Sequence, residues 1–199
     1  ENGALFPPSF WDTVCNDVLF PIFNVLRNRS DVTRFSTHED MSVWLSTTMI
    51  QALRHLIALW THFFDTLQSR LGGLLELLCA CICQENDTLA RIGTACLQQL
   101  IVQNLTHMDA SAWELVADAF LRLFRATIAT QVFDPALSST EHAMPATERR
   151  AAFKQIIVKC VLQLLLIETA HELLQDTAVY EAVPVAQQLR HTAALEDSY

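Results

Sequence analysis

The sequence predicts an all-α fold, and two observations lead to that prediction. Its 199 residues include only four glycines and six prolines, so turns are few and long regular segments are expected. Apolar residues, 51% of the chain, recur at spacings of three and four, as on the buried face of an amphipathic helix. Patterns typical of strands are absent.

The first helix is expected to begin at Ser9, which can cap it together with Asp12 three residues on. Pro21 should disturb this helix, because proline lacks a backbone donor and its ring clashes with the preceding turn. We therefore expect a kink or short break near Leu19. Residues 28–40 are polar and form the first predicted loop.

From Met41 to Leu67 the spacing predicts one long amphipathic helix of about seven turns. A turn or weakened helix should follow over 68–73. Residues 74–83 then form a nearly all-apolar helix, which we expect to be buried on most sides. The longest apolar run, about 13 residues, is too short to span a bilayer.

Two capped helices are predicted next. Asn86-Asp87 begins the first, which buries Leu89, Ile92, Cys96, Leu97, Leu100 and Ile101, and Asp87 can pair with Arg91 one turn on. Asp109 caps the second, with Met108 and Trp113 as a hydrophobic staple. Its buried stripe is Trp113, Val116, Ala117, Phe120, Leu123, Phe124 and Ile128.

The C-terminal part is predicted to hold a long helix over 148–175 and a weaker helix over 176–195, restarted near Pro184. The inward residues of the long helix are expected to be Phe153, Ile156, Ile157, Cys160, Val161, Leu164, Ile167 and Leu174. Long helices in successive antiparallel pairs favour a HEAT- or armadillo-like α-solenoid over a helical bundle. We divide the chain into helical repeats over 1–130, a linker over 131–147 and a further repeat with a C-terminal helix over 148–199.

Charge and cysteine usage exclude some classes of function. The net charge of −9 repels phosphate, so nucleic-acid binding is disfavoured. The six cysteines lie inside apolar segments, which indicates reduced thiols and an intracellular protein. No secretory signal pattern is evident at the start of the sequence.

Residues that could carry chemistry are interpreted as structural. Cys79, Cys81 and Cys83 lack the spacing of a zinc site, and alternate helical positions point about 200° apart. We expect them to be small apolar side chains in a buried helix.

The histidines are treated in the same way. His55 and His62, near Asp65, are interpreted as solvated residues, and His171 as a hydrogen-bonded, half-buried one. No nucleotide-binding or hydrolase motif occurs. We predict no catalytic residue, no cofactor and no metal.

Two basic clusters are either solvated faces or docking patches for an acidic GTPase surface or lipid headgroups. The first, at the loop over 28–40, contains Arg27, Arg29 and Arg34, and we assign it a partner-binding role. The second, in the long C-terminal helix, contains Arg149, Arg150, Lys154 and Lys159.

Three blocks carry a resemblance to a known family. They are Phe10-Trp11 with Val18 to Phe23, the stretch from Trp44 to Thr48 continuing to Phe63-Phe64, and the stretch from Gln84 to Leu97. In this order they resemble the C-terminal region of the large Golgi Arf guanine nucleotide-exchange factors of the BIG and yeast Sec-seven type, of which a fungal member fits best. The resemblance is clear over roughly residues 5 to 130 and matches helical modules downstream of the catalytic domain.

That resemblance implies a cytoplasmic protein, peripheral on trans-Golgi network membranes, which loads GTP onto Arf. The loop that carries the family's catalytic glutamate has no counterpart in this sequence, so no catalytic residue is carried over. The resemblance therefore implies that the chain is a regulatory and scaffolding segment, which binds small GTPases of the Arf or Rab class or other domains of its parent protein. Whether two copies form a homodimer stays open.

Two alternatives from other classes remain at this point. An unrelated HEAT-repeat scaffold or transport receptor would bind peptides or proteins in a concave groove. An unrecognised helical enzyme would need a polar pocket with perturbed titratable groups.

The core assignment makes a prediction about stability. Replacing Leu97 or Phe120 by Ala should lower the free energy of unfolding by about 2 to 5 kcal/mol, because each change leaves a cavity in the core. Thermal or urea unfolding of the two variants measures this. Unchanged stability in both would contradict the assigned faces.

Overall fold

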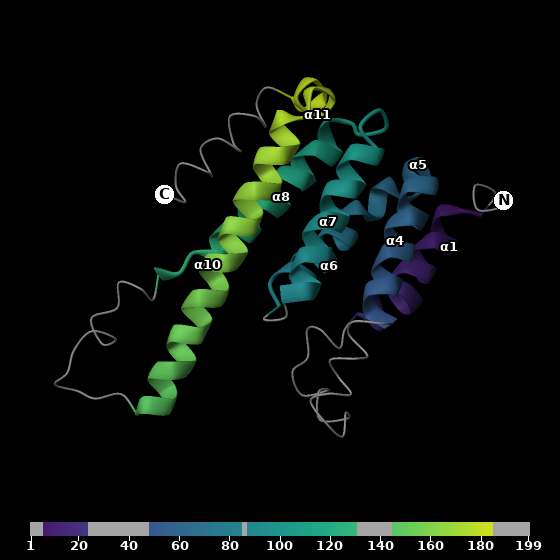
Figure 1. Ribbon diagram of the computed structural model, residues 1–199. Helices are drawn as coiled ribbons and strands as arrows, with labels where there is room; N and C mark the ends of the chain where they lie inside the picture. The colour runs from purple at the N-terminus through teal and green to yellow at the C-terminus, as the bar shows by residue number, and fades with distance from the viewer. Residues whose placement is uncertain (1–5, 24–47, 85–86, 131–144, 185–199) are drawn as a thin grey trace.

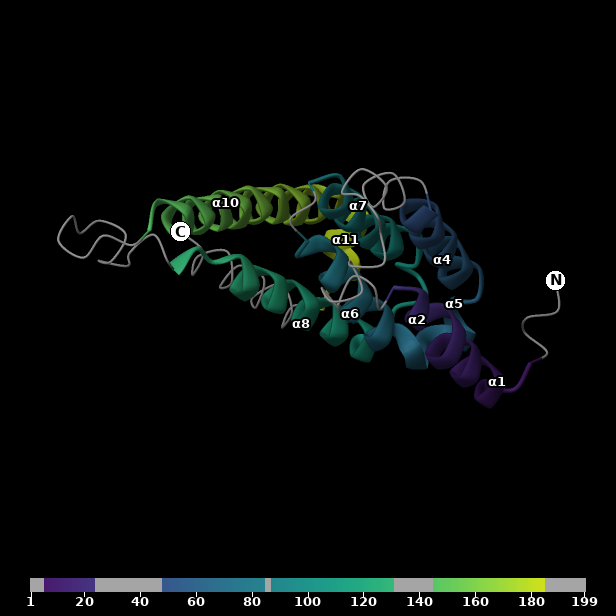
Figure 2. The same ribbon diagram turned by 90° about the horizontal axis from the view of Figure 1, so that it is seen from below.

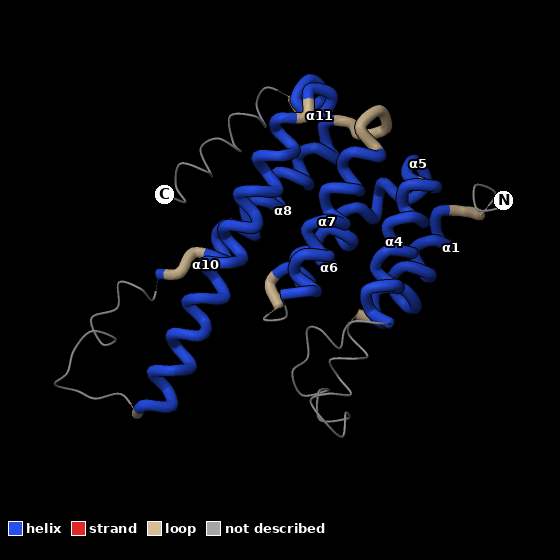
Figure 3. The backbone as a smooth tube through the Cα atoms, in the orientation of Figure 1, coloured by secondary structure: helices blue, strands red, loops and turns tan. Residues whose placement is uncertain are grey.

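The computed structural model describes residues 6–23, 48–84, 87–130 and 145–184. Every regular element in these ranges is helical, as the tube in Figure 3 shows, so the predicted all-α class is confirmed for the part of the chain that is described. The elements are α1 (Pro8–Thr13), the π-helix η2 (Val14–Leu19), α2 (Phe20–Ile22), α4 (Ile50–His62), α5 (Phe64–Leu67), the 3₁₀ helix η6 (Gln68–Arg70), α6 (Leu71–Ile82), α7 (Asp87–Gln103), α8 (Ala110–Thr127), α10 (Ala146–Gln175) and α11 (Thr177–Ala182).

The main helices lie in two rows, and successive helices alternate between them (Figures 1 and 2). One row contains α1 to α2, then α6, then α8. The other contains α4, then α7, then α10. Neighbours contact each other within each row, and α6 packs against α7 between the rows.

The start of α1 differs from the sequence-based expectation. The helix begins at Pro8 with Pro7 as its N-cap, and no side chain caps it. Proline at the first helical position needs no hydrogen bond for its nitrogen, so Ser9 lies inside the helix and the predicted Ser9 cap is wrong. Asp12 instead forms an ion pair with Arg70 of η6, which ties the first helix to the middle of the chain.

Pro21 disturbs its helix as predicted, but by widening it. The preceding residues Val14–Leu19 form a π-helix, and the backbone N–H of Phe20 donates to the carbonyl of Cys15. A π turn adds one residue per hydrogen-bonded ring, which changes the register of the turn before the proline. The helical path therefore continues through Pro21 where we expected a kink or break near Leu19.

The prediction of a single helix up to Leu67 is wrong. Phe63 leaves helical geometry, with φ −121° and ψ 33°, and so separates α4 from α5. Residues 41–47 lie outside the described ranges. The weakened helix expected over 68–73 is found as η6, but α6 already begins at Leu71, so both glycines of this segment are helical.

Helix α6 forms the centre of the core, as its apolar sequence predicts. Its buried residues are Leu71, Leu74, Leu75, Leu77, Leu78, Cys81 and Ile82. It packs against α7 on one side and α8 on another. A Cβ atom at Gly93 of α7 would lie 2.8 Å from Cγ1 of Ile82, so the close approach of α6 and α7 requires glycine there.

The assigned faces of α7 and α8 are confirmed. Leu97 is 1% exposed and Phe120 2% exposed. The backbone N–H of Ala112 donates to Oδ1 of Asp109 at 2.8 Å, which confirms the predicted cap, and Trp113 one residue on is buried. Both helices have one apolar stripe, which is why their orientation could be predicted from spacing.

The predicted inward face of α10 is right for Ile156 and Ile167, which are buried or packed against the core, and wrong for most of its other residues. Phe153, Ile157, Cys160, Val161 and Leu164, all expected to face inward, are exposed. The buried residues are Ile156, Leu162, Leu166, Thr169, Ala170 and Leu173. Since α10 is apolar on two opposite sides, a spacing of three and four fits either side, and the sequence does not decide between them.

Of the weaker C-terminal helix expected over 176–195, the structure describes α11, which ends at Ala182. Asp176 caps it by accepting from the backbone N–H of Ala178 at 2.9 Å. Residues 185–195 lie outside the described ranges. Within those ranges no helix has the length and apolar character needed to cross a membrane.

The two glycines at positions 72 and 93 should respond oppositely to alanine. Gly72→Ala should stabilise the protein by about 0.5 to 1 kcal/mol, since the added methyl meets nothing closer than 3.9 Å and helix entropy favours Ala. Gly93→Ala should destabilise it by about 1 to 3 kcal/mol through the clash with Ile82. Urea unfolding of both variants tests the packing, and stabilisation by Gly93→Ala would show that α6 and α7 are not so close.

Candidate binding surfaces

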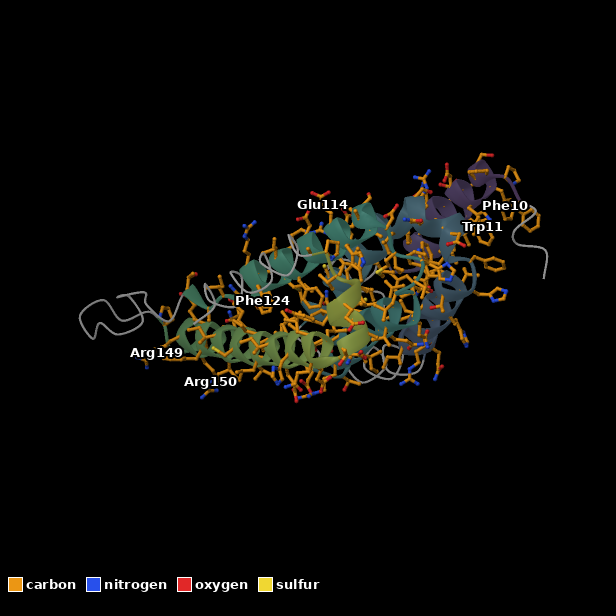
Figure 4. All side chains as sticks on the ribbon, turned by 90° about the horizontal axis from the view of Figure 1, so that it is seen from above. Phe10, Trp11, Glu114, Phe124, Arg149 and Arg150 are labelled. Carbon is orange, nitrogen blue, oxygen red and sulfur yellow. The ribbon has the colours of Figure 1, made fainter. Side chains whose placement is uncertain are left out.

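The predicted basic clusters have different outcomes. Arg27, Arg29 and Arg34 lie outside the described ranges, so their partner-binding role stays a prediction. Arg149 and Arg150 are exposed in the first turn of α10 and point away from the other helices (Figure 4). Lys159, by contrast, is half-buried and donates to the carbonyl of Ile128 at 3.4 Å, which ties α10 to the end of α8.

The three cysteines of α6 point in different directions. Cys81 is buried, Cys79 is half-buried and Cys83 is exposed, in keeping with the angle expected between alternate helical positions. Burial raises the pKa of Cys79 to about 11 and that of Cys96 to about 11. Both thiols are therefore protonated at neutral pH, and a protonated thiol is a poor nucleophile and a poor metal ligand.

The histidines show one pairing that sequence reasoning missed. His55 and His62 are exposed on α4, and Asp65 lies 2.9 Å from Nδ1 of His107, in the turn after α7. The prediction of a half-buried His171 is wrong, because that residue is exposed on α10. In the described ranges, no three or more His, Cys, Asp or Glu residues are placed to hold a metal ion.

The contact between Asp65 and His107 belongs to a polar seam joining α4 and α5 to the end of α7. Thr61 Oγ1 donates to Oε1 of Gln103 at 3.2 Å, and the buried Asn104 donates through Nδ2 to Oγ1 of Thr61 at 3.4 Å. These partners are far apart in sequence or lie in a turn, so neither spacing nor a motif identified them. The seam holds two helices of one row together and contains no arrangement typical of a catalytic site.

A mixed-charge groove of about 400 Å³ lies between α6 and α8. Its lining residues are Gly72, Glu76, Leu115, Asp118, Leu121, Arg122 and Arg125. Arg122 Nη1 lies 3.8 Å from Glu76 Oε1, and both side chains are at least half exposed. Such a groove suits a polar, charged partner surface.

Two sets of exposed apolar residues lie at opposite ends of the described structure, one beginning at Phe6 just before α1 and one on α10. The N-terminal set consists of Phe6, Phe10, Val18 and Ile22, and the C-terminal set consists of Phe153, Ile157, Val161 and Leu164 on α10. Figure 4 shows Phe10 and Arg149 at opposite ends of the molecule. On α10 the four residues recur at spacings of four and three, and a continuous exposed apolar face of this kind marks an interaction surface.

The chain is similar to several curated proteins. It is 53% identical over 132 residues to the ADP-ribosylation factor guanine nucleotide-exchange factor SEC7 of Saccharomyces cerevisiae, an alignment that covers 66% of this chain and 7% of that protein. It is 35% identical over 230 residues to the corresponding factor sec72 of Schizosaccharomyces pombe, covering 100% of this chain and 13% of that protein. The human brefeldin A-inhibited guanine nucleotide-exchange protein 1 is 24% identical over 144 residues, covering 72% of this chain and 7% of that protein.

No family model matches the chain, and no solved structure matches it. The chain spans between 7% and 13% of the length of these relatives, and the two fungal ones are more similar to it than the human one. Because the sequence identity to these exchange factors extends along the whole chain, the alternative of an unrelated HEAT-repeat scaffold is disfavoured. The chain therefore belongs, as a segment, to the family of large Arf guanine nucleotide-exchange factors of the Sec7 and brefeldin A-inhibited type.

Proposed function

We propose that the chain is a non-catalytic regulatory and scaffolding segment of an Arf guanine nucleotide-exchange factor. It lies downstream of the exchange domain and acts in trans-Golgi vesicle trafficking by binding other proteins. The observation that carries the proposal is the 35% identity along the whole chain to a fungal exchange factor, of which it covers 13%. A segment that is matched throughout, yet is so small a part of the relative, acts as one module of a larger protein.

The chemistry of the described residues supports a binding role. Exchange chemistry in this family resides in a separate catalytic domain, according to the resemblance described above. The polar groove between α6 and α8 is lined by carboxylates, guanidinium groups and aliphatic side chains, and by no cysteine or histidine among the described residues. Paired charges at an exposed groove suit recognition of another charged surface.

The arrangement of the helices supports a HEAT- or armadillo-like solenoid. Helices that alternate between two rows, each touching the next helix of its own row, form an array that grows in one direction. The division into repeats over 1–130 and 148–199 remains part of this proposal. In the structure α10 packs against α7 and α8, so the part after the linker shares its core with the part before it.

The partners we propose are small GTPases of the Arf or Rab class, or other domains of the parent protein. The parent would be cytoplasmic and peripheral on trans-Golgi network membranes, with this segment reaching the membrane through it. A partner that binds one conformation of the parent protein more tightly than another increases the population of the first conformation. The size of this shift is set by the difference between the partner's affinities for the two conformations. This gives a binding segment a way to regulate exchange without taking part in the chemistry.

The test is capture of purified Arf and Rab proteins, loaded with either GTP or GDP, by the immobilised 199-residue chain. We expect one nucleotide state to be retained more strongly, and Arg27→Glu, Arg29→Glu and Arg34→Glu together to remove that capture. The matched control changes the other basic cluster, with Arg149→Glu and Arg150→Glu. If neither nucleotide state is captured and the remainder of the parent protein does not bind the chain either, the binding role is wrong.

A further inference from the structure

The groove between α6 and α8 is lined by a glycine that the packing of this molecule does not require. Of the three glycines in the described ranges, Gly73 and Gly93 leave no room for a side chain, because an added Cβ atom would lie 2.8 Å from a neighbouring side chain. At Gly72 the nearest atom is Cδ2 of Leu115 at 3.9 Å, which is an ordinary contact distance. Alanine would therefore fit at this position and would favour the helix. A helical glycine with no packing reason inside the molecule indicates close approach of something from outside it.

The groove is bounded by two helices that run in the same direction. Gly72 lies beside Leu115, and further along α6 Glu76 lies 3.8 Å from Arg122, so the residue numbers increase together along the two helices. Both helices belong to the same row (Figure 2). The lining residues of α8, from Leu115 to Arg125, span about 15 Å of helix. The groove therefore has the shape to hold a third helix laid along it.

The side chains along the groove change in character from one end to the other. The apolar end is lined by Leu115, which is 36% exposed. The carboxylate of Asp118 comes next along α8, and the guanidinium group of Arg125 lines the far end. Between them Glu76 and Arg122 form an ion pair. A phosphate backbone or an anionic membrane would be repelled by these carboxylates, whereas a protein segment with both charges complements the groove.

We propose that this groove binds an amphipathic helix of another protein, laid antiparallel to α6 and α8. From its N-terminus, the bound helix presents a carboxylate to Arg125 and, seven positions later, a basic residue to Asp118. Three or four positions further on, a large apolar side chain fills the space above Gly72 and contacts Leu115. The antiparallel direction is favoured because it places the carboxylate near the N-terminus of the bound helix, where the helix dipole stabilises a negative charge.

The size of the groove sets the expected affinity. A single helix that lies along about 15 Å of groove buries less surface than the roughly 1,200 Å² of a stable standard interface. Binding should therefore be reversible, with a dissociation constant in the micromolar range. The inference adds a surface to the proposed binding role and does not depend on the capture of a GTPase.

Selection from a phage-displayed library of helical peptides, each of about 16 residues, tests the proposal on the immobilised 199-residue chain. We expect the enriched peptides to contain an acidic, a basic and a large apolar residue in that order and at those spacings. A synthetic copy of an enriched peptide should bind with micromolar affinity, measured by fluorescence anisotropy. An enriched pool without this pattern, or no enrichment at all, overturns the proposal.

The variant Gly72→Leu tests whether the peptide lies in the groove. The leucine side chain fills the space above the glycine, so it should weaken binding of the synthetic peptide by about tenfold or more. Circular dichroism and thermal unfolding should show a fold at least as stable as the natural one, because leucine favours a helix. The matched control Ala151→Leu adds the same side chain at an exposed position of α10 and should leave binding unchanged. Equal binding to the Gly72→Leu variant and to the natural chain overturns the site.

Charge reversal tests the alignment of the bound helix. Arg125→Glu should weaken binding by about tenfold, and a peptide whose acidic residue is replaced by lysine should recover binding to this variant. The matched control Arg150→Glu reverses an exposed arginine of α10 and should have no effect. A lysine peptide that does not recover binding overturns the antiparallel alignment. If the peptides behave as expected but no GTPase is captured, only the GTPase part of the proposed function fails.

Discussion

The burial of α6 is the constraint on which the rest of the structure depends. A helix of twelve residues that buries seven of them needs neighbours on several sides, and α7, α8 and α2 supply them. Two glycines allow the close approach. A Cβ atom at Gly73 would lie 2.8 Å from the ring of Phe20, and one at Gly93 would lie 2.8 Å from Ile82. Because α6 packs against α8 and α2 in its own row and against α7 in the other row, its burial holds the two rows of helices together.

Helices with a single apolar stripe could be predicted from the sequence. The faces of α7 and α8, the Asp109 cap and the burial of α6 agree with the structure because spacing, capping chemistry and composition are local signals. The break at Phe63 has no proline or glycine to indicate it. Most of the predicted inward face of α10 is wrong, because a helix that is apolar on two opposite sides gives no local sequence signal for which side is buried.

Polar contacts within one helix, such as Asp87 with Arg91 at 2.9 Å, could be predicted from spacing, but those between separate helices could not. Asp65 contacts His107, and Glu76 contacts Arg122. The residues of each pair are far apart in the sequence and become neighbours only when their helices pack. A short linear pattern identifies a site whose residues are neighbours along the chain. A binding surface assembled from separate helices leaves no such pattern, which is also why the groove between α6 and α8 went unnoticed.

The surface features of the described residues support the proposed binding role. Burial keeps the thiols of Cys79 and Cys96 protonated, two ion pairs are exposed, and the outer face of α10 presents an apolar stripe. Together with the similarity to a small part of large exchange factors, these features support the proposal that this segment acts in recognition.

The measurement that tests this account most directly is the rate of release of a fluorescent GDP from Arf. The purified 199-residue chain is added alone, with a known exchange domain as the positive control. The account predicts that the chain leaves the spontaneous rate unchanged at any concentration. A rate that rises in proportion to the chain concentration would contradict it, because the segment would then contain an exchange site of its own.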